Sequence, residues 1–228
     1  MVPHTVEAAG KQLNATAQAA LDAAVAALQQ SDLAAAERSA RAAVAAAPRS
    51  AQTHNILGVV LDREGRKDES FAQFNTAISL DPNSVGVRNN LGRLLAERGK
   101  PKEAIAEFER VLKVDPSHVE AHYNLGVLYG DAGDFVKAAE HFARARAAAP
   151  HDPQLALAFL NVAYRANRRE ETESAVDLVE RSVASDARGL FTLATVLAQS
   201  KQYEHAARVF ARVNELAPHT YEILYNLG

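Results

Sequence analysis

The chain has 228 residues, of which 48% are apolar and only 6% aromatic, and its formal net charge is −3. With 25 basic and 28 acidic residues it has no excess of positive charge, which disfavours nucleic acid or an anionic membrane surface as its partner. It contains no cysteine, which excludes disulfides, cysteine nucleophiles and cysteine metal ligands but fits any redox compartment.

Residues 1–16 form an N-terminal segment that has neither the basic start nor the continuous apolar stretch of a signal peptide. No later stretch approaches the length of apolar sequence that a membrane span needs, so we expect no membrane insertion. We expect a soluble protein, with the cytoplasm slightly favoured over the periplasm or secretion. Arginine outnumbers lysine and alanine is abundant, which points to a bacterial source.

After this segment, prolines recur at multiples of 34 residues. They are Pro48, Pro82, Pro116, Pro150 and Pro218, and the one missing step is Ala184. A fixed period of this length is typical of a chain of stacked identical units, each packing mainly on its neighbours. We therefore expect repeats at 17–50, 51–84, 85–118, 119–152, 153–186 and 187–220, and the start of a seventh at 221–228.

Each repeat is expected to hold two helices. Apolar residues recur at helical spacing in both halves of a repeat, as Leu57, Val60 and Leu61 do. Glycine separates the halves at places such as Gly65 and Gly133, where a helix ends most easily with a residue at positive φ. The proline of each period then ends the second helix, because the residue before proline is pushed out of the helical region. No segment shows the alternation of a β-strand.

Several columns of the stacked repeats carry a family resemblance. They are a Leu-Gly pair in the first helix, an alanine and then a phenylalanine in the second, and a closing Asp-Pro, namely Leu57-Gly58, Leu91-Gly92 and Leu125-Gly126, with Tyr129, Ala104, Ala138, Phe108, Phe142, Asp81-Pro82 and Asp115-Pro116. In these residues the chain resembles the tetratricopeptide repeat family, over about residues 17–228. The resemblance implies an all-α fold, an α-solenoid whose helix-turn-helix repeats form a right-handed superhelix.

The chain departs from the family pattern in two ways. The large aromatic of the family's fourth place is replaced in three repeats, by His54, Arg88 and His122. Repeat 153–186 is degenerate, because Leu160 stands where glycine is usual and faces Thr172 in place of alanine. Since leucine and threonine need more room, we expect a wider spacing of the two helices in that repeat.

The resemblance also implies a concave groove, lined by the first helices, that takes extended or helical peptides. It implies that the groove is formed by the second, fifth, sixth, ninth, twelfth and thirteenth residues of each repeat. These columns form a mixed polar and aromatic strip, and its candidate binding residues are Asn55, Asn89, Asn90, Arg93, Tyr123, Asn124, Val127, Asn161, Tyr164 and Arg165. We expect the partner to lie along repeats 51–152, where the family pattern and the amides are strongest. The fifth place of the repeats carries no lysine, which argues against the carboxylate clamp of chaperone-binding members.

Asn90, Asn124 and Asn226 share the sixth place, so we expect them to project on the same side. An amide can pair with peptide backbone of any sequence, and the arrangement resembles the asparagine ladder of O-linked N-acetylglucosamine transferases. The alternative is that these asparagines serve the fold or bind water. The groove arginines likewise either favour an acidic peptide or pair with carboxylates of the chain, such as Glu97 and Asp131.

Recognisable catalytic and metal-binding motifs are missing from the sequence. His118 and His122 are four residues apart, a spacing that lets two histidines of one helix share a metal. His118, however, precedes the start of the expected helix, and no third ligand accompanies the two. We therefore expect structural or surface histidines, with no metal, no cofactor and no catalysis.

The sequence thus predicts a non-catalytic scaffold that binds a protein or peptide segment in its groove. The alternative is the substrate-recruiting arm of a larger enzyme, similar to a peptide O-glycosyltransferase, that is truncated at Gly228. Because Tyr221, Leu224 and Leu227 then lack a following helix to pack on, we expect self-association through this end.

Overall fold

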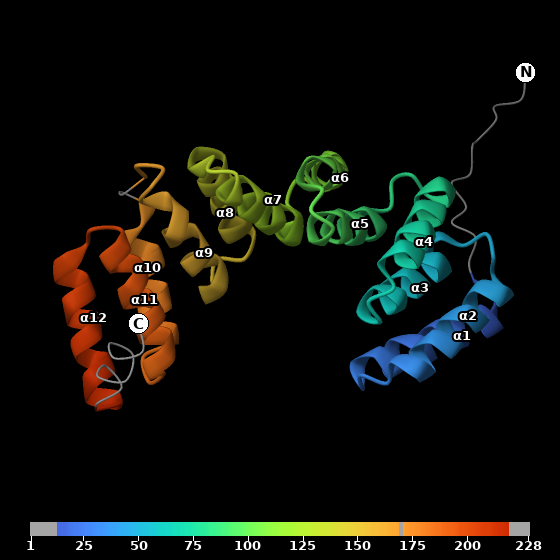
Figure 1. Cartoon of the computed structure of the whole chain (residues 1–228), viewed down its shortest axis with the longest axis horizontal. Helices are drawn as coiled ribbons and strands as arrows, with labels where there is room; N and C mark the ends of the chain where they lie inside the picture. Colours follow the sequence, from blue (N-terminus) through green and yellow to red (C-terminus); the bar gives the residue numbers. More distant parts are fainter. Residues whose placement is uncertain (1–12, 169–170, 219–228) are drawn as a thin grey trace, which may run out of the picture. The chain divides into compact units, whose positions relative to one another are not determined.

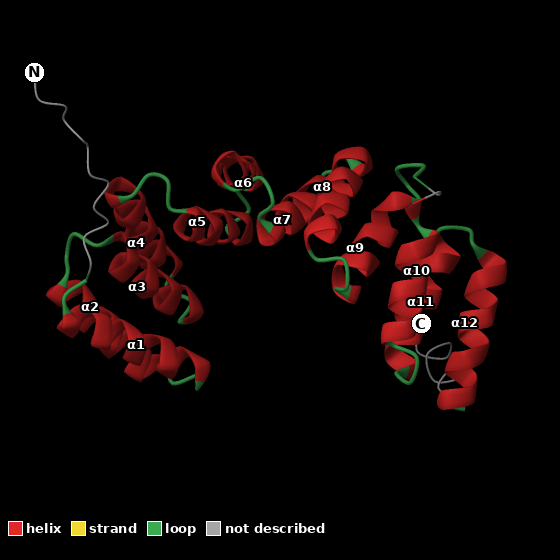
Figure 2. Ribbon diagram, turned by 180° about the vertical axis from the view of Figure 1, so that it is seen from behind, coloured by secondary structure: helices red, strands yellow, loops and turns green. Residues whose placement is uncertain are grey.

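The protein is all-α. The structure, a computed structural model, describes residues 13–168 and 171–218. In these residues twelve α-helices follow one another, without a strand, and each packs against its neighbour as a helix-turn-helix pair (Figures 1 and 2). Within the same residues, no helix combines the length and the apolar character that crossing a lipid bilayer requires.

The chain divides into two compact units, residues 1–116 and 117–228. The helices of the first unit are α1 Ala15–Gln29, α2 Leu33–Ala46, α3 Ala51–Arg63, α4 Lys67–Leu80, α5 Val85–Glu97 and α6 Pro101–Val114. The helices of the second unit are α7 Val119–Asp131, α8 Phe135–Ala148, α9 Pro153–Ala163, α10 Glu173–Ser182, α11 Ala187–Gln199 and α12 Tyr203–Leu216. Each pair falls within one expected repeat, except that α1 begins two residues early, whereas 221–228 lie outside the described residues. The right-handed superhelix stays a prediction.

The turn inside every helix pair has the same backbone geometry. The fifteenth residue of each repeat has positive φ, and these residues are Ser31 (60°), Gly65 (79°), Gly99 (71°), Gly133 (80°), Asn167 (58°) and Lys201 (61°). The next residue donates its N–H to a carbonyl at the end of the first helix, as Arg66 does to Leu61 at 2.9 Å. The positive φ expected at the glycines is therefore confirmed, and three repeats adopt it with a side chain present, at some cost in strain.

Glycine at the eighth place makes room for phenylalanine at the twenty-fourth. A Cβ atom added to the glycine would lie within 2.6–2.8 Å of the ring in three repeats, at Gly58 with Phe74, Gly92 with Phe108 and Gly126 with Phe142. All three rings are buried. The two helices of these repeats therefore approach until the ring of one rests on the bare backbone of the other.

The altered fourth place is filled by a polar pair in each of three repeats. The fourth residue meets the twenty-third, on the second helix of the same repeat: His54 with Gln73 at 2.7 Å, Arg88 with Glu107 at 2.6 Å and His122 with His141 at 3.0 Å. These pairs replace the interhelical packing of an aromatic ring by a directed hydrogen bond or ion pair. They connect the two helices at a partly buried position.

Repeat 153–186 is irregular in a way that the sequence analysis does not predict. Its second helix, α10, starts at Glu173, four residues later in the repeat than α8 starts at Phe135. Leu160 is nevertheless fully buried and Thr172 is 5% exposed, so the larger residues are accommodated in the core. The repeat thus differs by a shorter second helix, and the wider helix spacing stays a prediction.

Candidate binding groove

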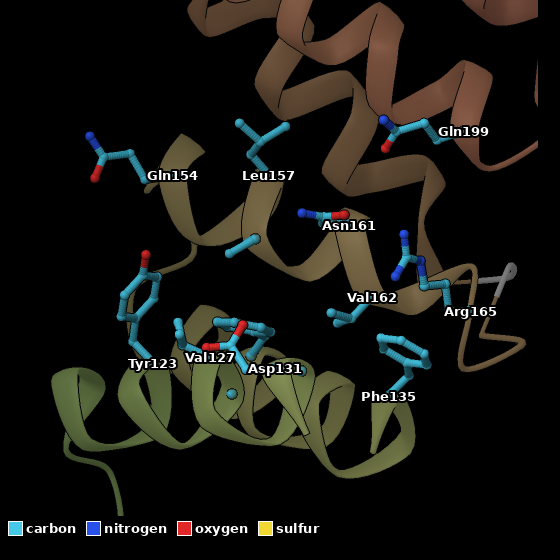
Figure 3. A pocket seen from close by; sticks show the side chains of 14 residues that line it. Tyr123, Val127, Asp131, Phe135, Gln154, Leu157, Asn161, Val162, Arg165 and Gln199 are labelled. Carbon is cyan, nitrogen blue, oxygen red and sulfur yellow. The ribbon is translucent and has the colours of Figure 1, made fainter. Parts of the chain in front are cut away.

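The second unit contains a groove of about 720 Å³ (Figure 3). Helices α7, α8, α9 and α11 contribute to it, and four of the predicted binding residues line it: Tyr123, Val127, Asn161 and Arg165. In Figure 3, Tyr123, Val127 and Asp131 rise from α7, and Asn161 of α9 and Arg165 of the turn after it lie opposite, with Gln199 of α11 beyond them. The groove therefore starts in the last of the repeats where we expected the partner and continues beyond them.

The floor of the groove is hollow because small residues line it. Gly126, Gly130 and Ala158 take up little space between α7 and α9. A Cβ at Gly126 would meet the ring of Phe142 at 2.8 Å, so this place admits only glycine without a shift. At Gly130 the nearest side-chain atom, on Val162, would be 3.7 Å away, so a larger residue there would fill the hollow rather than clash at once.

Apolar side chains are exposed on the α7 side of the groove. Tyr123 is 39% exposed and Val127 is 37% exposed, and they lie one helical turn apart. The Tyr123 ring packs edge-on against Phe142, with ring centroids 5.6 Å apart, which holds it in place. A ligand that covers this side would remove apolar surface from water.

The polar groups of the groove lie on both walls. Arg165 places its guanidinium 5.0 Å from the centroid of the Phe135 ring, and Asn161 lies one turn before it on α9. Asp131 ends α7, and Gln199 ends α11. Arg165 and Asp131 are exposed, and neither forms an ion pair within 4 Å in the described part of the chain. Counting ion pairs among residues 13–168 and 171–218 alone, the groove thus presents one free cation and one free anion together with amides.

The first unit contains a ring of ion pairs. The Asp62 carboxylate, only 3% exposed, accepts from Lys67 Nζ at 2.6 Å and from Arg93 Nη2 at 2.7 Å. Glu97 closes the ring, because it pairs with Arg93 at 2.8 Å and also with Lys67. The hydrogen bond to Asp62, followed by that to Glu97, raises the pKa of Lys67, so this ammonium group stays charged near neutral pH. We call Asp62, Lys67, Arg93 and Glu97 the ionic ring.

The ionic ring and the groove occupy the same places of the repeat. Two periods of 34 residues beyond the ionic ring, the same four places hold Gly130, Phe135, Asn161 and Arg165. All four line the groove. Where the first unit joins two neighbouring repeats by ion pairs, the second unit has a small residue, an aromatic, an amide and a guanidinium without a carboxylate partner in the described residues.

The predicted asparagines of the first unit are used within the chain. Asn90 donates from Nδ2 to Asn55 Oδ1 at 3.0 Å, which links neighbouring repeats. Asn89 is 8% exposed, which leaves little of its side chain for a ligand. Arg93 belongs to the ionic ring, so the alternative that a groove arginine pairs with Glu97 is confirmed for this residue. These polar groups therefore already have contacts within the chain.

Two other predicted residues do not line the groove. Asn124 is half-buried on α7, and Tyr164 lines a separate pocket of about 550 Å³ with residues of α10 and α12. Asn226, the third member of the expected amide row, lies outside the described residues. The row of amides at the sixth place is therefore not what brings polar groups together in the groove.

Several residues that line the groove were not among the predicted binding residues, and they include Phe135, Gln154, Leu157 and Gln199. Gln154 and Gln199 occupy the second and thirteenth places, which belong to the columns expected to face the groove, so the column pattern could have found them. Leu157 has the place of Tyr123 in the next repeat. Phe135 belongs to a second helix, and the family resemblance directs attention to first helices only.

The histidines have structural contacts. His118 caps α7 by accepting the N–H of Ala121 at 3.1 Å, and His122 faces His141 Nδ1 to Nδ1. Burial, together with the neighbouring His122, lowers the pKa of His141 to about 4, so this ring is neutral at physiological pH. Across the described residues, no cluster of three or more histidine, cysteine, aspartate or glutamate side chains is arranged to hold a metal ion.

Comparison with known proteins agrees with the repeat pattern. A tetratricopeptide repeat family model matches residues 11–85 and 89–153, more than half of the chain. A comparison with curated protein sequences gives no significant match.

Solved structures of similar fold cover nearly the whole chain. PilF of Pseudomonas aeruginosa is 21% identical with a TM-score of 0.76, and the alignment covers 93% of this chain and 96% of that one. PilW, a type IV pilus biogenesis factor, is 20% identical with a TM-score of 0.77, covering 94% and 100%. YrrB, described as a TPR protein with an unusual peptide-binding site, is 16% identical with a TM-score of 0.67, covering 82% and 96%. Together with the paired helices and the constant turn geometry, the family match shows that the chain belongs to the tetratricopeptide repeat family.

Proposed function

We propose that the protein is a non-catalytic scaffold that binds a peptide or protein segment in the groove of its second unit. The observation that carries this proposal is the exchange of the ionic ring for Gly130, Phe135, Asn161 and Arg165 at the same places of the repeat. Closing these places with ion pairs is compatible with the fold, as the first unit shows. In the second unit these places leave a groove open, and we infer that a ligand uses it.

The groove offers what an extended peptide needs. Its hollow floor can take an apolar side chain, and burying one fully contributes about 1.5–3 kcal/mol. The amides of Asn161 and Gln199 can donate and accept, so they suit the backbone of a peptide of any sequence. The exposed faces of Tyr123 and Val127 supply the apolar wall that recognition of such a segment uses.

The family supports this function as a class. Tetratricopeptide repeats typically mediate protein–protein interactions, and YrrB is described as having a peptide-binding site. The expected alternative, an arm that recruits substrates for a larger enzyme, would use the groove in the same way. Both alternatives therefore share the groove experiment.

The proposal can be tested by closing the groove with the ring found in the first unit. The variant Gly130→Asp/Phe135→Lys/Asn161→Arg/Arg165→Glu places the four ring residues at the equivalent places. Its binding is compared with that of the wild type on an array of short synthetic peptides with a central leucine. We expect affinity to fall about tenfold or more, since the hollow for one apolar side chain is lost.

Two further variants keep the test sharp. Tyr123→Ala/Val127→Ala removes exposed apolar surface with little effect on the core, and we expect it to weaken binding as well. Asn90→Ala lies in the first unit, outside the groove, and is the matched control that should bind like the wild type. Circular dichroism checks that each variant is folded. Binding that falls in Asn90→Ala but survives in the folded ring variant would overturn the assignment to this groove.

A further inference from the structure

Each of the two walls of the groove carries a charge that has no ion-pair partner in the described part of the chain. Arg165 lies in the turn that follows α9, Asp131 belongs to α7, and both side chains are exposed. Arg165 contacts the Phe135 ring, a contact that holds the guanidinium without neutralising it. Among the described residues, neither has an ion-pair partner within 4 Å.

The ionic ring shows how unusual this is within the same fold. Arg165 has the place of Glu97, which pairs with both Lys67 and Arg93. The carboxylate of Glu97 that closes the ionic ring is thus replaced by a cation in the second unit. The two cations that pair with Glu97 are replaced by Phe135 and Asn161. The charges of the groove are therefore left for a ligand to meet.

A bound segment has to satisfy both charges at once. A neutral ligand that covered Arg165 or Asp131 would strip water from the charge and offer nothing in return, which is unfavourable. A ligand of a single sign would pair with one wall and repel the other. A ligand with one group of each sign meets both walls, while its apolar residue occupies the hollow between them.

We propose that the groove selects peptide segments carrying one acidic and one basic side chain on either side of an apolar residue, with the acidic group at Arg165 and the basic group at Asp131. This specificity rests on the proposed function. In Figure 3, Asn161 and Gln199 lie on the Arg165 side, where their amide N–H groups can donate further hydrogen bonds to the ligand's carboxylate. Asp131 lies across the groove on the side of Val127.

The probe is an array of short synthetic peptides built on alanine with one central leucine. Each peptide carries one glutamate and one lysine, one on either side of the leucine, and the array covers all such positions in both orders. In the matched peptides, glutamine replaces the glutamate, the lysine or both. Binding is measured for the wild type and for the isosteric variants Arg165→Gln and Asp131→Asn, with Arg144→Gln, an exposed arginine that does not line the groove, as the control. All three changes are made at exposed side chains, so folding is expected to survive.

We expect each charge of the peptide to tighten binding by about fivefold relative to the peptide that has glutamine at that position. This factor corresponds to the free energy of one exposed ion pair. Arg165→Gln should abolish the preference for glutamate and keep that for lysine, and Asp131→Asn should do the reverse. Equal binding of charged and neutral peptides by the wild type would overturn the charge specificity and leave the groove as a binding site. Binding of none of the peptides by the wild type would count against the proposed function itself.

Discussion

The two units share a backbone pattern, and they differ in what four places of the repeat carry. In the first unit the ionic ring joins two neighbouring repeats through a carboxylate that is almost fully buried. In the second unit the same places line a groove of about 720 Å³. Both units share the turn at the fifteenth residue of the repeat and the packing of a phenylalanine side chain against a glycine backbone.

The comparison separates the residues that pack the two helices of a repeat from the residues that can change its binding properties. Glycine at the eighth place and phenylalanine at the twenty-fourth set the distance between paired helices, so they recur in both units. The four places of the ionic ring lie where two neighbouring repeats meet, and the fold tolerates ion pairs or an open hollow there. A change at these places can therefore alter binding without altering the repeat.

The largest effect is expected where the two units are alike. Phe108→Ala in the first unit and Phe142→Ala in the second each remove a buried ring that rests on a glycine backbone. We expect each change to lower the free energy of unfolding of its own unit by about 3–5 kcal/mol, through lost burial and the cavity left behind. Hydrogen exchange followed by mass spectrometry measures this for each unit separately, because a repeat array can unfold in parts.

The variants Phe108→Ala and Phe142→Ala also test whether the two units are packed alike and differ in binding. Phe142 lines the groove, so its removal should weaken peptide binding, whereas removal of Phe108 should not. A much smaller loss of stability for one ring than for the other would show that the two units are not packed alike. Gly126→Ala provides a second measurement, since its Cβ would press on the same ring at 2.8 Å.

The sequence predicted the repeat much better than the groove. The helix pairs and the positive φ at the glycines follow from local chemistry and a fixed period, so they could be read from single columns. The ionic ring could not be read in this way, because Asp62 and Lys67 lie at the ends of two helices and Arg93 belongs to the next repeat. Only the fold shows that these columns meet, and the exchange for residues such as Gly130 then becomes visible in the sequence.

A second prediction concerns the ionic ring alone. Asp62→Ala removes the carboxylate that pairs with both Lys67 and Arg93 and leaves two cations facing each other. We expect the first unit to lose about 2 kcal/mol, less than for a fully buried pair because both cations are partly exposed. Asp131→Ala in the second unit is the matched control, and its unpaired carboxylate should contribute almost nothing to stability. Urea unfolding at low and high salt measures the free energy of unfolding of both variants. An equal loss of stability in the two variants would contradict this prediction.

The smallest expected effect distinguishes the polar pairs at the fourth place by their response to acid. The pKa of His141 is lowered to about 4 in the folded protein, first by burial and then by His122, whereas an exposed histidine has a pKa of about 6.5. Between these two pKa values, His141 is therefore protonated in the unfolded chain and neutral in the folded chain. Stability from this pair is complete above about pH 6.5 and falls as the pH drops toward 4. Because His141 is only half-buried, we expect a loss of about 1 kcal/mol.

The charges around the histidine pair do not reverse this sign. Lys137 and Arg144, on the helix of His141, lower the pKa of His141 further, whereas Glu140 raises it, and Tyr129 of α7 stacks on the ring without a charge. The change His141→Gln would copy the pair formed by His54 and Gln73 in the first unit, where a glutamine oxygen faces the imidazole. Thermal unfolding of this variant between pH 7 and pH 4 should show a second unit less sensitive to acid than in the wild type. If the variant loses as much stability on acidification as the wild type, the histidine pair is not the group that responds, and the two kinds of fourth-place pair are equivalent.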